Sequence, residues 1–194
     1  RYFEPIVGSY SYTYVGNNYE RDVQFTKYYT DPSEQLRKLG IQTTVYGNWL
    51  QKSPERKDPK ELISSFPYVA FGGRLSYKDI FPAFNNSVTV THITKDDYIP
   101  YGNITGRFFE AIKSGVPALI PHEYVHARPV GLDGELVVKS SEDVIQKVKW
   151  LFDMSLEDRI DLVNSQEKAL RTVIDPRPEA RVDLLERVTK GERR

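Results

Sequence analysis

The fold is decided by the stretch Ile104-Thr-Gly-Arg-Phe-Phe-Glu-Ala-Ile-Lys-Ser-Gly-Val-Pro-Ala-Leu-Ile120. Over Ile104–Ser114, apolar residues recur at intervals of three and four, which predicts an amphipathic helix. Gly115 is typical of a residue that ends a helix, and the apolar run Pro117–Ile120 follows at once as a predicted buried strand. A helix that leads directly into a buried strand is half of a β–α–β unit, and it therefore indicates a parallel sheet.

Strands and helices alternate in the same way on both sides of this stretch. Runs rich in Val, Ile, Thr, Tyr and Phe predict five further strands at Tyr10–Val15, Gln42–Tyr46, Tyr68–Phe71, Val88–Ile93 and Glu135–Val138. Helices are predicted to begin after capping signals at Asp31, Ser76, Ser141 and Ser155. We therefore expect an α/β fold, with a doubly wound, mainly parallel sheet and helices on both of its faces.

The length of 194 residues suits one domain of this kind. We expect it to span residues 10–175, with residues 1–9 as an interdomain linker and residues 176–194 as a charged tail. The stretch Lys52–Lys60 is charged and punctuated by proline, which indicates a surface excursion. Because the chain opens with Arg1, we expect a fragment, a processed product or a trimmed chain.

The composition excludes several classes of protein. Lys and Arg number 27, as do Asp and Glu, so there is no net charge to attract nucleic acid or an anionic membrane over a distance. The absence of cysteine excludes a disulfide framework, a thiolate zinc site and a cysteine nucleophile. No apolar run approaches the ~20 residues of a membrane span, and no secretory signal is evident. We expect a cytoplasmic protein with no membrane partner.

Arg107 and Glu110 are the strongest candidates for a binding function. They are three residues apart, so they share one face of the predicted helix near its start. A helix start suits a phosphate, and the guanidinium of Arg107 would add two parallel hydrogen bonds to it. Glu110 could accept hydrogen bonds from the two hydroxyls of a ribose. The alternative is a surface ion pair on an ordinary helix.

Three other turns follow predicted strands, where ligands bind in open parallel sheets. Gly16–Arg21 is a small-residue turn that could approach a phosphate, with Arg21 as a second cation. Gly73 and Leu75 follow the third strand and could pack against a planar base. Asp96 could face a metal or sugar hydroxyls. For each turn, the alternative is an ordinary connection without a ligand.

The histidines do not predict a metal site. His122 and His126 are four apart, but Pro121 and Pro129 argue against a helix there, and no third ligand is apparent.

Taken together, these positions resemble the nucleotide-binding, C-terminal half of a GT-B glycosyltransferase. The run from Arg107 through Glu110 to Pro117 is similar to the RxxE helix of that superfamily and the strand entry after it. The order of the other turns is similar to that of the phage DNA β-glucosyltransferases, over about residues 2–172. One departure is the turn Asn17–Asp22, which holds one arginine where that family has an arginine-rich phosphate loop.

The resemblance implies a role for each candidate. Gly16 and Asn17 would approach a diphosphate through their backbone, with Arg21 beside them, and Arg107 would bind phosphate. Glu110 would bind the ribose, and Asp96 would lie near the sugar or the diphosphate. Uracil would be flanked by residues on the next two strands, namely Tyr46, Gly73 and the backbone of Leu75.

The resemblance implies that a hexose is transferred from a UDP-sugar to a modified base in phage DNA. The alternatives are a GT-B enzyme that acts on a polysaccharide, lipid or small molecule, and a nucleotide-binding module without catalysis. The partners would be the UDP-sugar, the N-terminal half of the same enzyme, and duplex DNA as acceptor. No cofactor is required, whereas Mg²⁺ or Mn²⁺ could assist. The catalytic base is expected in the N-terminal half, so this chain alone should be inactive.

Overall fold

The computed structural model describes residues 11–49, 58–101, 103–124 and 134–173. The predicted linker at 1–9 and the predicted tail at 176–194 lie outside these residues, as do His126 and most of the charged stretch 52–60. Within the described residues, no helix combines the length and the apolar character that crossing a membrane requires.

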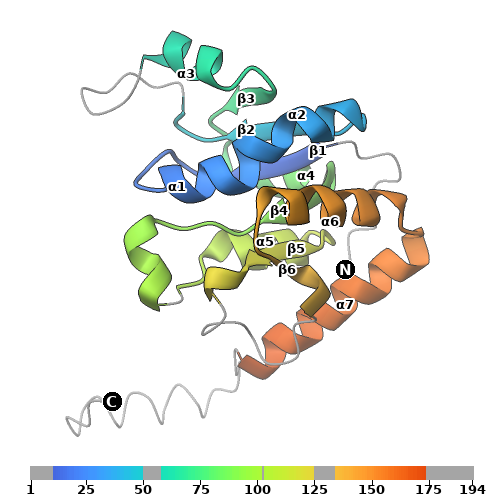
Figure 1. The fold of residues 1–194 in the computed structure, drawn as a ribbon. Helices are drawn as coiled ribbons and strands as arrows, with labels where there is room; N and C mark the ends of the chain where they lie inside the picture. Colours follow the sequence, from blue (N-terminus) through green and yellow to red (C-terminus); the bar gives the residue numbers. More distant parts are fainter. Residues whose placement is uncertain (1–10, 50–57, 102, 125–133, 174–194) are drawn as a thin grey trace, which may run out of the picture.

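Six parallel strands form one sheet, in the order β3-β2-β1-β4-β5-β6 (Figure 1). The strands are β1 (Ser11–Val15), β2 (Gln42–Tyr46), β3 (Val69–Gly73), β4 (Ser87–Thr91), β5 (Ala118–Pro121) and β6 (Val137–Val138). The chain winds outward from β1 to one edge, returns to the centre at β4, and then winds to the other edge. This confirms the predicted doubly wound α/β fold.

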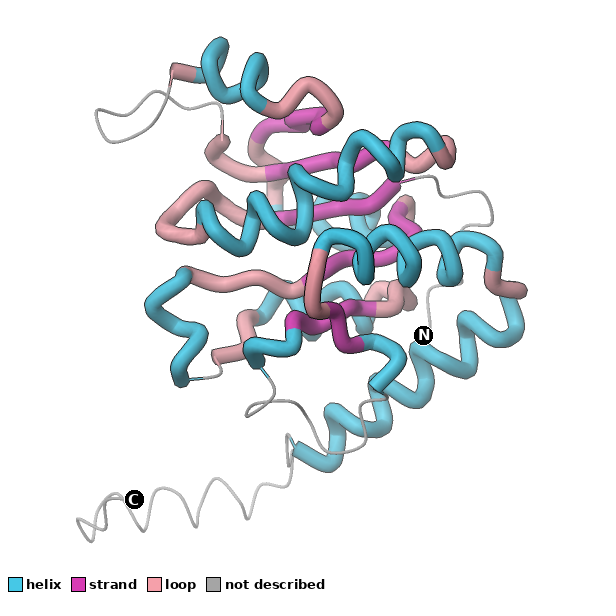
Figure 2. The backbone as a smooth tube through the Cα atoms, viewed as in Figure 1, coloured by secondary structure: helices cyan, strands magenta, loops and turns pink. Residues whose placement is uncertain are grey.

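Helices cover both faces of the sheet, as Figures 1 and 2 show. One layer contains α1 (Asp22–Phe25), a π-helical segment (Thr26–Thr30), α2 (Asp31–Lys38) and α6 (Ser141–Asp153). The opposite layer contains α4 (Tyr77–Asn85), α5 (Gly106–Lys113) and α7 (Leu156–Val173). Helix α3 (Pro59–Ser65) leads into the edge strand β3, and short 3₁₀ turns lie at Asp96–Tyr101, His122–Tyr124 and Gly134–Leu136.

Two helical starts differ from the prediction. The helix expected to begin at Asp31 begins at Asp22, because the π-helical segment carries it through Pro32. There the amide of Asp31 bonds to the carbonyl of Thr26, five residues back, in a wider turn than an α-helix has. Helix α6 is capped by Ser140 rather than Ser141, since the Ser140 hydroxyl accepts from the amide of Asp143 at 3.2 Å.

Each face of the sheet has its own buried cluster. Beneath α1, α2 and α6 the cluster is rich in aromatic rings, and Tyr12 stacks on Tyr29 with ring centres 4.7 Å apart. Beneath α4, α5 and α7 it is mostly aliphatic and includes the rings of Phe84 and Phe108. Burial of these two apolar faces is the main driving force for the fold.

The sheet opens between β1 and β4. These strands pair only at Ser11–Ser87 and Tyr12–Thr89, with a register shift between the two pairs. Beyond that point the Tyr29 hydroxyl takes the place of a strand partner, accepting from the amide of Thr91 at 2.8 Å and donating to its carbonyl at 2.5 Å. The two strands therefore diverge where the winding direction reverses, which leaves a crevice at their carboxyl ends.

Candidate functional site

A cavity of about 380 Å³ occupies this crevice. Its walls come from β1 and the following loop, from the end of β4, and from the first turn of α5. Of the nine residues predicted from the sequence to form the site, four line the cavity: Gly16, Asn17, Arg21 and Arg107. The fold thus brings together two turns that are some ninety residues apart in the sequence.

The loop after β1 is held tightly by its neighbours. The Gly16 amide donates to the carbonyl of Tyr46 at 2.9 Å, and the Gly16 carbonyl accepts from the indole of Trp49 at 2.7 Å. The side-chain oxygen of Asn17 accepts from the amide of Asn48 at 3.1 Å. Because the Gly16 amide is already engaged, the loop amides that could serve a ligand begin at Asn17.

The ends of β1, β2 and β3 interlock through glycines. Gly47 has a φ of 138°, and a Cβ atom there would lie 2.0 Å from the Gly16 carbonyl oxygen. Its amide donates to the carbonyl of Gly73 at 2.7 Å. Only glycine permits this conformation and this approach. Gly16, Tyr46 and Gly73 consequently form one continuous rim, although only Gly16 lines the cavity itself.

Two arginines supply positive charge to the cavity. Arg21 precedes α1; its guanidinium donates to the Tyr14 hydroxyl and to the carbonyl of Tyr19. Arg107 lies in the first turn of α5 and forms an ion pair with Glu110. The predicted sharing of one helix face by Arg107 and Glu110 is therefore confirmed, and both side chains remain partly exposed.

Leu75 lies beyond the rim rather than in the cavity. It is partly buried and packs with Tyr46 on the aliphatic cluster beneath α5. Adjacent parallel strands are about 4.8 Å apart, so β3 lies roughly 10 Å from β1. This separation suits a ligand that extends from the cavity along the rim toward Gly73 and Leu75.

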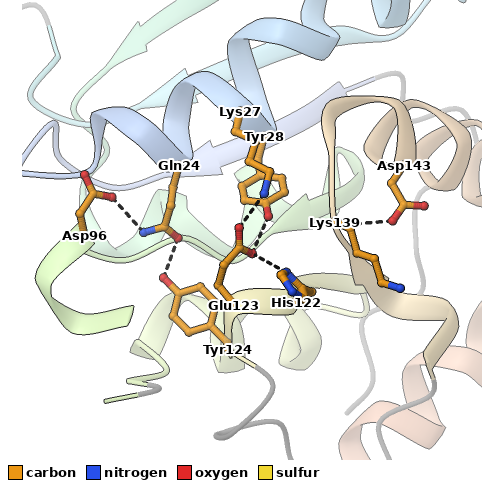
Figure 3. A network of polar contacts seen from close by, with 9 residues as sticks. All are labelled: Gln24, Lys27, Tyr28, Asp96, His122, Glu123, Tyr124, Lys139 and Asp143. Carbon is orange, nitrogen blue, oxygen red and sulfur yellow. Dashed lines mark hydrogen bonds and ion pairs between the residues drawn. The ribbon is translucent and has the colours of Figure 1, made fainter. Parts of the chain in front are cut away.

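The Asp96 carboxylate bonds to the side chain of Gln24 (Figure 3). The amide group of Gln24 donates to Asp96 at 3.2 Å and to the carbonyl of Thr94 at 3.1 Å. The hydroxyl of Tyr124 donates to the side-chain oxygen of Gln24 at 2.6 Å. Asp96 thus belongs to a polar network beside the cavity, and it is not among the residues that line it.

A second part of this network ties the turn after β5 to the π-helical segment (Figure 3). Glu123 forms an ion pair with Lys27 at 2.6 Å and accepts from the Tyr28 hydroxyl at 2.6 Å. Burial alone would raise the pKa of Glu123, but these two partners hold that pKa below its usual value. The carboxylate therefore stays charged and fixes the turn.

His92 lines the cavity and was not singled out as a ligand-binding residue from the sequence. Its ring lies edge-on to Phe108 and Tyr124 and is fully buried. Burial lowers the pKa of His92 to about 4, so the imidazole is neutral at physiological pH. The signal that could have identified it is its position one residue after β4, at the carboxyl edge of the sheet.

Metal-binding groups do not gather around the cavity. Throughout the described ranges, no three His, Asp or Glu side chains are grouped so that they could hold a metal ion.

No protein-family model matches the chain, and no curated protein sequence matches it. Among solved structures it is similar to the DNA-modifying enzyme β-glucosyltransferase, with 19% identity, a TM-score of 0.66 and 89% of this chain covered. Another similar structure is the T4 phage enzyme in complex with UDP and Mn²⁺, with 19% identity, a TM-score of 0.60 and 90% of this chain covered. A third is the catalytic domain of cholesterol-α-glucosyltransferase from Helicobacter pylori, with 18% identity and a TM-score of 0.61.

The extent of these matches differs. The chain spans about half of the first two structures, 49% and 51% of their length. It covers 99% of the Helicobacter pylori domain, to which 84% of this chain aligns. The likeness therefore concerns one Rossmann-like unit, and in its fold this chain is like part of the GT-B glycosyltransferases.

Proposed function

We propose that this chain is the donor-binding part of a glycosyltransferase and holds a UDP-sugar from which a hexose is transferred. The observation that carries the proposal is the convergence of Arg21 and Arg107 on one cavity at the switch point of a parallel sheet. The likeness of the fold to that of glycosyltransferases supports it. Open sheets of this topology bind nucleotides at this place.

The two arginines bind the diphosphate of the donor. Phosphate oxygens accept charge-assisted hydrogen bonds from guanidinium groups, often two in parallel. When the sugar leaves, negative charge develops on the diphosphate, and fixed cations close to it lower the barrier. Arg107 also lies at the start of α5, where the helix dipole favours an anion.

Glu110 accepts from the ribose hydroxyls. An ionised carboxylate has about four acceptor positions, so Glu110 can keep its ion pair with Arg107 while it receives both hydroxyls. The uracil then lies along the rim toward Tyr46, Gly73 and Leu75. Asp96, with one carboxylate oxygen held by Gln24, would lie near the sugar or the diphosphate.

We extend the proposal to the acceptor, which is a modified base in phage DNA. The lack of net charge means that the contacts to DNA come mainly from the rest of a longer enzyme. The catalytic base also belongs there, since an acceptor hydroxyl needs a base within hydrogen-bond distance. A polysaccharide, a lipid or a small molecule is the alternative acceptor, and a nucleotide-binding module without catalysis is the alternative function.

We propose that no cofactor is required and that Mg²⁺ or Mn²⁺ could assist by neutralising charge on the diphosphate.

Calorimetric titration with UDP tests the donor site. Arg107→Ala and Glu110→Ala should each weaken binding by about 1.5–3 kcal/mol, because each removes a charge-assisted contact. Lys113→Ala is the matched control, since Lys113 is an exposed cation at the other end of the same helix. If Arg107→Ala and Glu110→Ala both bound UDP with wild-type affinity, the proposed site would be wrong.

A further inference from the structure

The side chain of Tyr14 extends from the central strand β1 to the cavity. It lies on β1 and is only 5% exposed, with its ring packed edge-on against Phe25 and Trp49. A Cβ atom on Gly16 would lie 2.3 Å from the Tyr14 hydroxyl oxygen. The phenol therefore runs along the strand past Gly16, and its hydroxyl arrives at the carboxyl edge among the residues that line the cavity.

The hydroxyl of Tyr14 has an unused hydrogen. Its oxygen accepts from the guanidinium of Arg21, but within residues 11–49, 58–101, 103–124 and 134–173 nothing accepts its proton. The other buried tyrosine hydroxyls each donate to an oxygen of the protein, as Tyr12, Tyr28, Tyr29 and Tyr124 do. Because Tyr14 lines the cavity, this hydrogen is available to a ligand that enters it.

The charges around Tyr14 set the direction of this donor. Because a lone pair of its oxygen faces Arg21, the O–H bond must turn away from that guanidinium. Burial raises the pKa of Tyr14, although Arg21 and, more weakly, Arg107 oppose the shift. The hydroxyl thus keeps its proton at neutral pH and acts as a donor. It lies in the field of both arginines, where an anion is the favoured ligand.

We propose that the Tyr14 hydroxyl donates a hydrogen bond to an anionic oxygen in the cavity while it holds Arg21 toward the same anion. This inference rests on the proposed function, which makes that anion the diphosphate of the donor. It adds a binding residue, Tyr14, whose ring belongs to the aromatic cluster beneath α1, α2 and α6. It also gives Gly16 a second role, because any side chain there would displace the phenol.

The test compares Tyr14→Phe with Tyr12→Phe in calorimetric titrations with UDP, pyrophosphate and uridine. Both variants lose one buried hydroxyl from the same strand and keep the ring. The Tyr12 hydroxyl is bonded within the protein to Tyr28 and Thr91, and Tyr12 does not line the cavity. We expect Tyr14→Phe to weaken binding of UDP and pyrophosphate about tenfold or more and to leave uridine binding unchanged. Tyr12→Phe should retain UDP affinity within about twofold.

Each outcome has a definite meaning. Wild-type affinity of Tyr14→Phe for UDP would overturn the inference alone. Equal losses for UDP and uridine in Tyr14→Phe, or the same loss in Tyr12→Phe, would also overturn it, because the hydroxyl would then act through the fold. Binding of pyrophosphate but not UDP by the wild-type chain would overturn the proposed function and leave the anion site standing. A wild-type chain that binds neither would overturn both.

Discussion

His92 shows how a single side chain in the cavity takes its properties from burial. Its imidazole ring centre lies 5.4 Å from that of Phe108 and 5.1 Å from that of Tyr124, and its Nε2 lies 3.4 Å from the carbonyl oxygen of Asn103. These neighbours cannot stabilise a charged ring well, and Arg21 repels it further. The cavity thus contains a neutral hydrogen-bonding group beside its two cations.

Stability should therefore depend on pH through His92. An unfolded histidine has a pKa near 6.5, whereas the folded pKa of His92 is about 4. Below pH 6.5 the unfolded state binds the extra proton, so stability is complete above that pH and is lost as the pH falls toward 4. Between pH 7 and pH 5 we expect the free energy of unfolding to fall by about 2 kcal/mol. Urea denaturation at the two pH values measures this change.

His92→Leu is the comparison for that measurement. It places an apolar side chain against Phe108 that cannot bind a proton, so most of the loss of stability between pH 7 and pH 5 should disappear. The stabilising effect of ionised Glu123 is lost only below the usual range of a carboxyl group, outside this interval. An identical pH dependence in the wild type and in His92→Leu would contradict the assignment.

Among the predicted site residues, helix periodicity was sufficient for Arg107 and Glu110, because a spacing of three residues within one helix determines that they meet. Asp96 shows what such local sequence patterns do not predict. Its position after a buried strand was correct, but its partner Gln24 is seventy-two residues away in the sequence. No local pattern indicates that pairing, and no local pattern could show that Tyr14 extends past Gly16.

At the level of elements, α7 is attached to the sheet by specific polar contacts as well as by apolar packing. The side chain of Gln166 is buried, and its two ends bond the amide and the carbonyl of Ala118 at 3.0 and 2.8 Å. Arg159, near the start of the helix, donates to the carbonyls of Ser87 and Val88. These contacts join α7 to the beginnings of β4 and β5, below the strand ends that form the cavity.

Gln166→Ala should destabilise the fold by about 2–4 kcal/mol, because it leaves two buried backbone groups of Ala118 without partners. Asn164→Ala is the control on the same helix. Asn164 is exposed, so the change should stay within about 0.5 kcal/mol. Thermal or urea unfolding followed by circular dichroism measures both variants, and equal stability of the two would contradict this role of Gln166.

The error in the predicted helix start at Asp31 has a tertiary cause. Asp31-Pro32 is typical of a helix start, yet the structure continues a helix through it with a π-helical turn. Tyr28 and Tyr29 lie in that turn and are fully buried, and the Tyr29 hydroxyl bonds to Thr13 of β1 and to Thr91 of β4. Tertiary burial of these rings compensates for the unfavourable local geometry, and a local sequence signal cannot include that contribution.

At the level of the whole molecule, the charges balance, but two positively charged side chains lie where the sheet opens. Arg21 and Arg107 both face one cavity although the net charge of the chain is zero. The field that a ligand meets is therefore local, and it acts on a group that enters the crevice rather than on a distant polyanion. This arrangement favours a small anionic ligand over direct binding of duplex DNA by this chain.

We expect the isolated chain to bind UDP without transferring sugar efficiently, since the proposed base belongs to the rest of a longer enzyme. Release of UDP from UDP-glucose, measured with and without DNA that contains hydroxymethylcytosine, tests this expectation. Turnover near 10 s⁻¹, the middle of the range for enzymes, would contradict it. Arg107→Ala provides the background rate.

The sequence by itself determined the fold class, because the periods of its apolar residues specify which segments become strands and which become helices that cover them. It also determined the Arg107–Glu110 pair, which depends on one helical turn. Only the tertiary structure decided that Arg21, Tyr14 and Arg107 share a cavity and that Asp96 bonds to Gln24 beside it. Those contacts arise where β1 and β4 diverge, and that separation depends on packing between segments far apart in the chain.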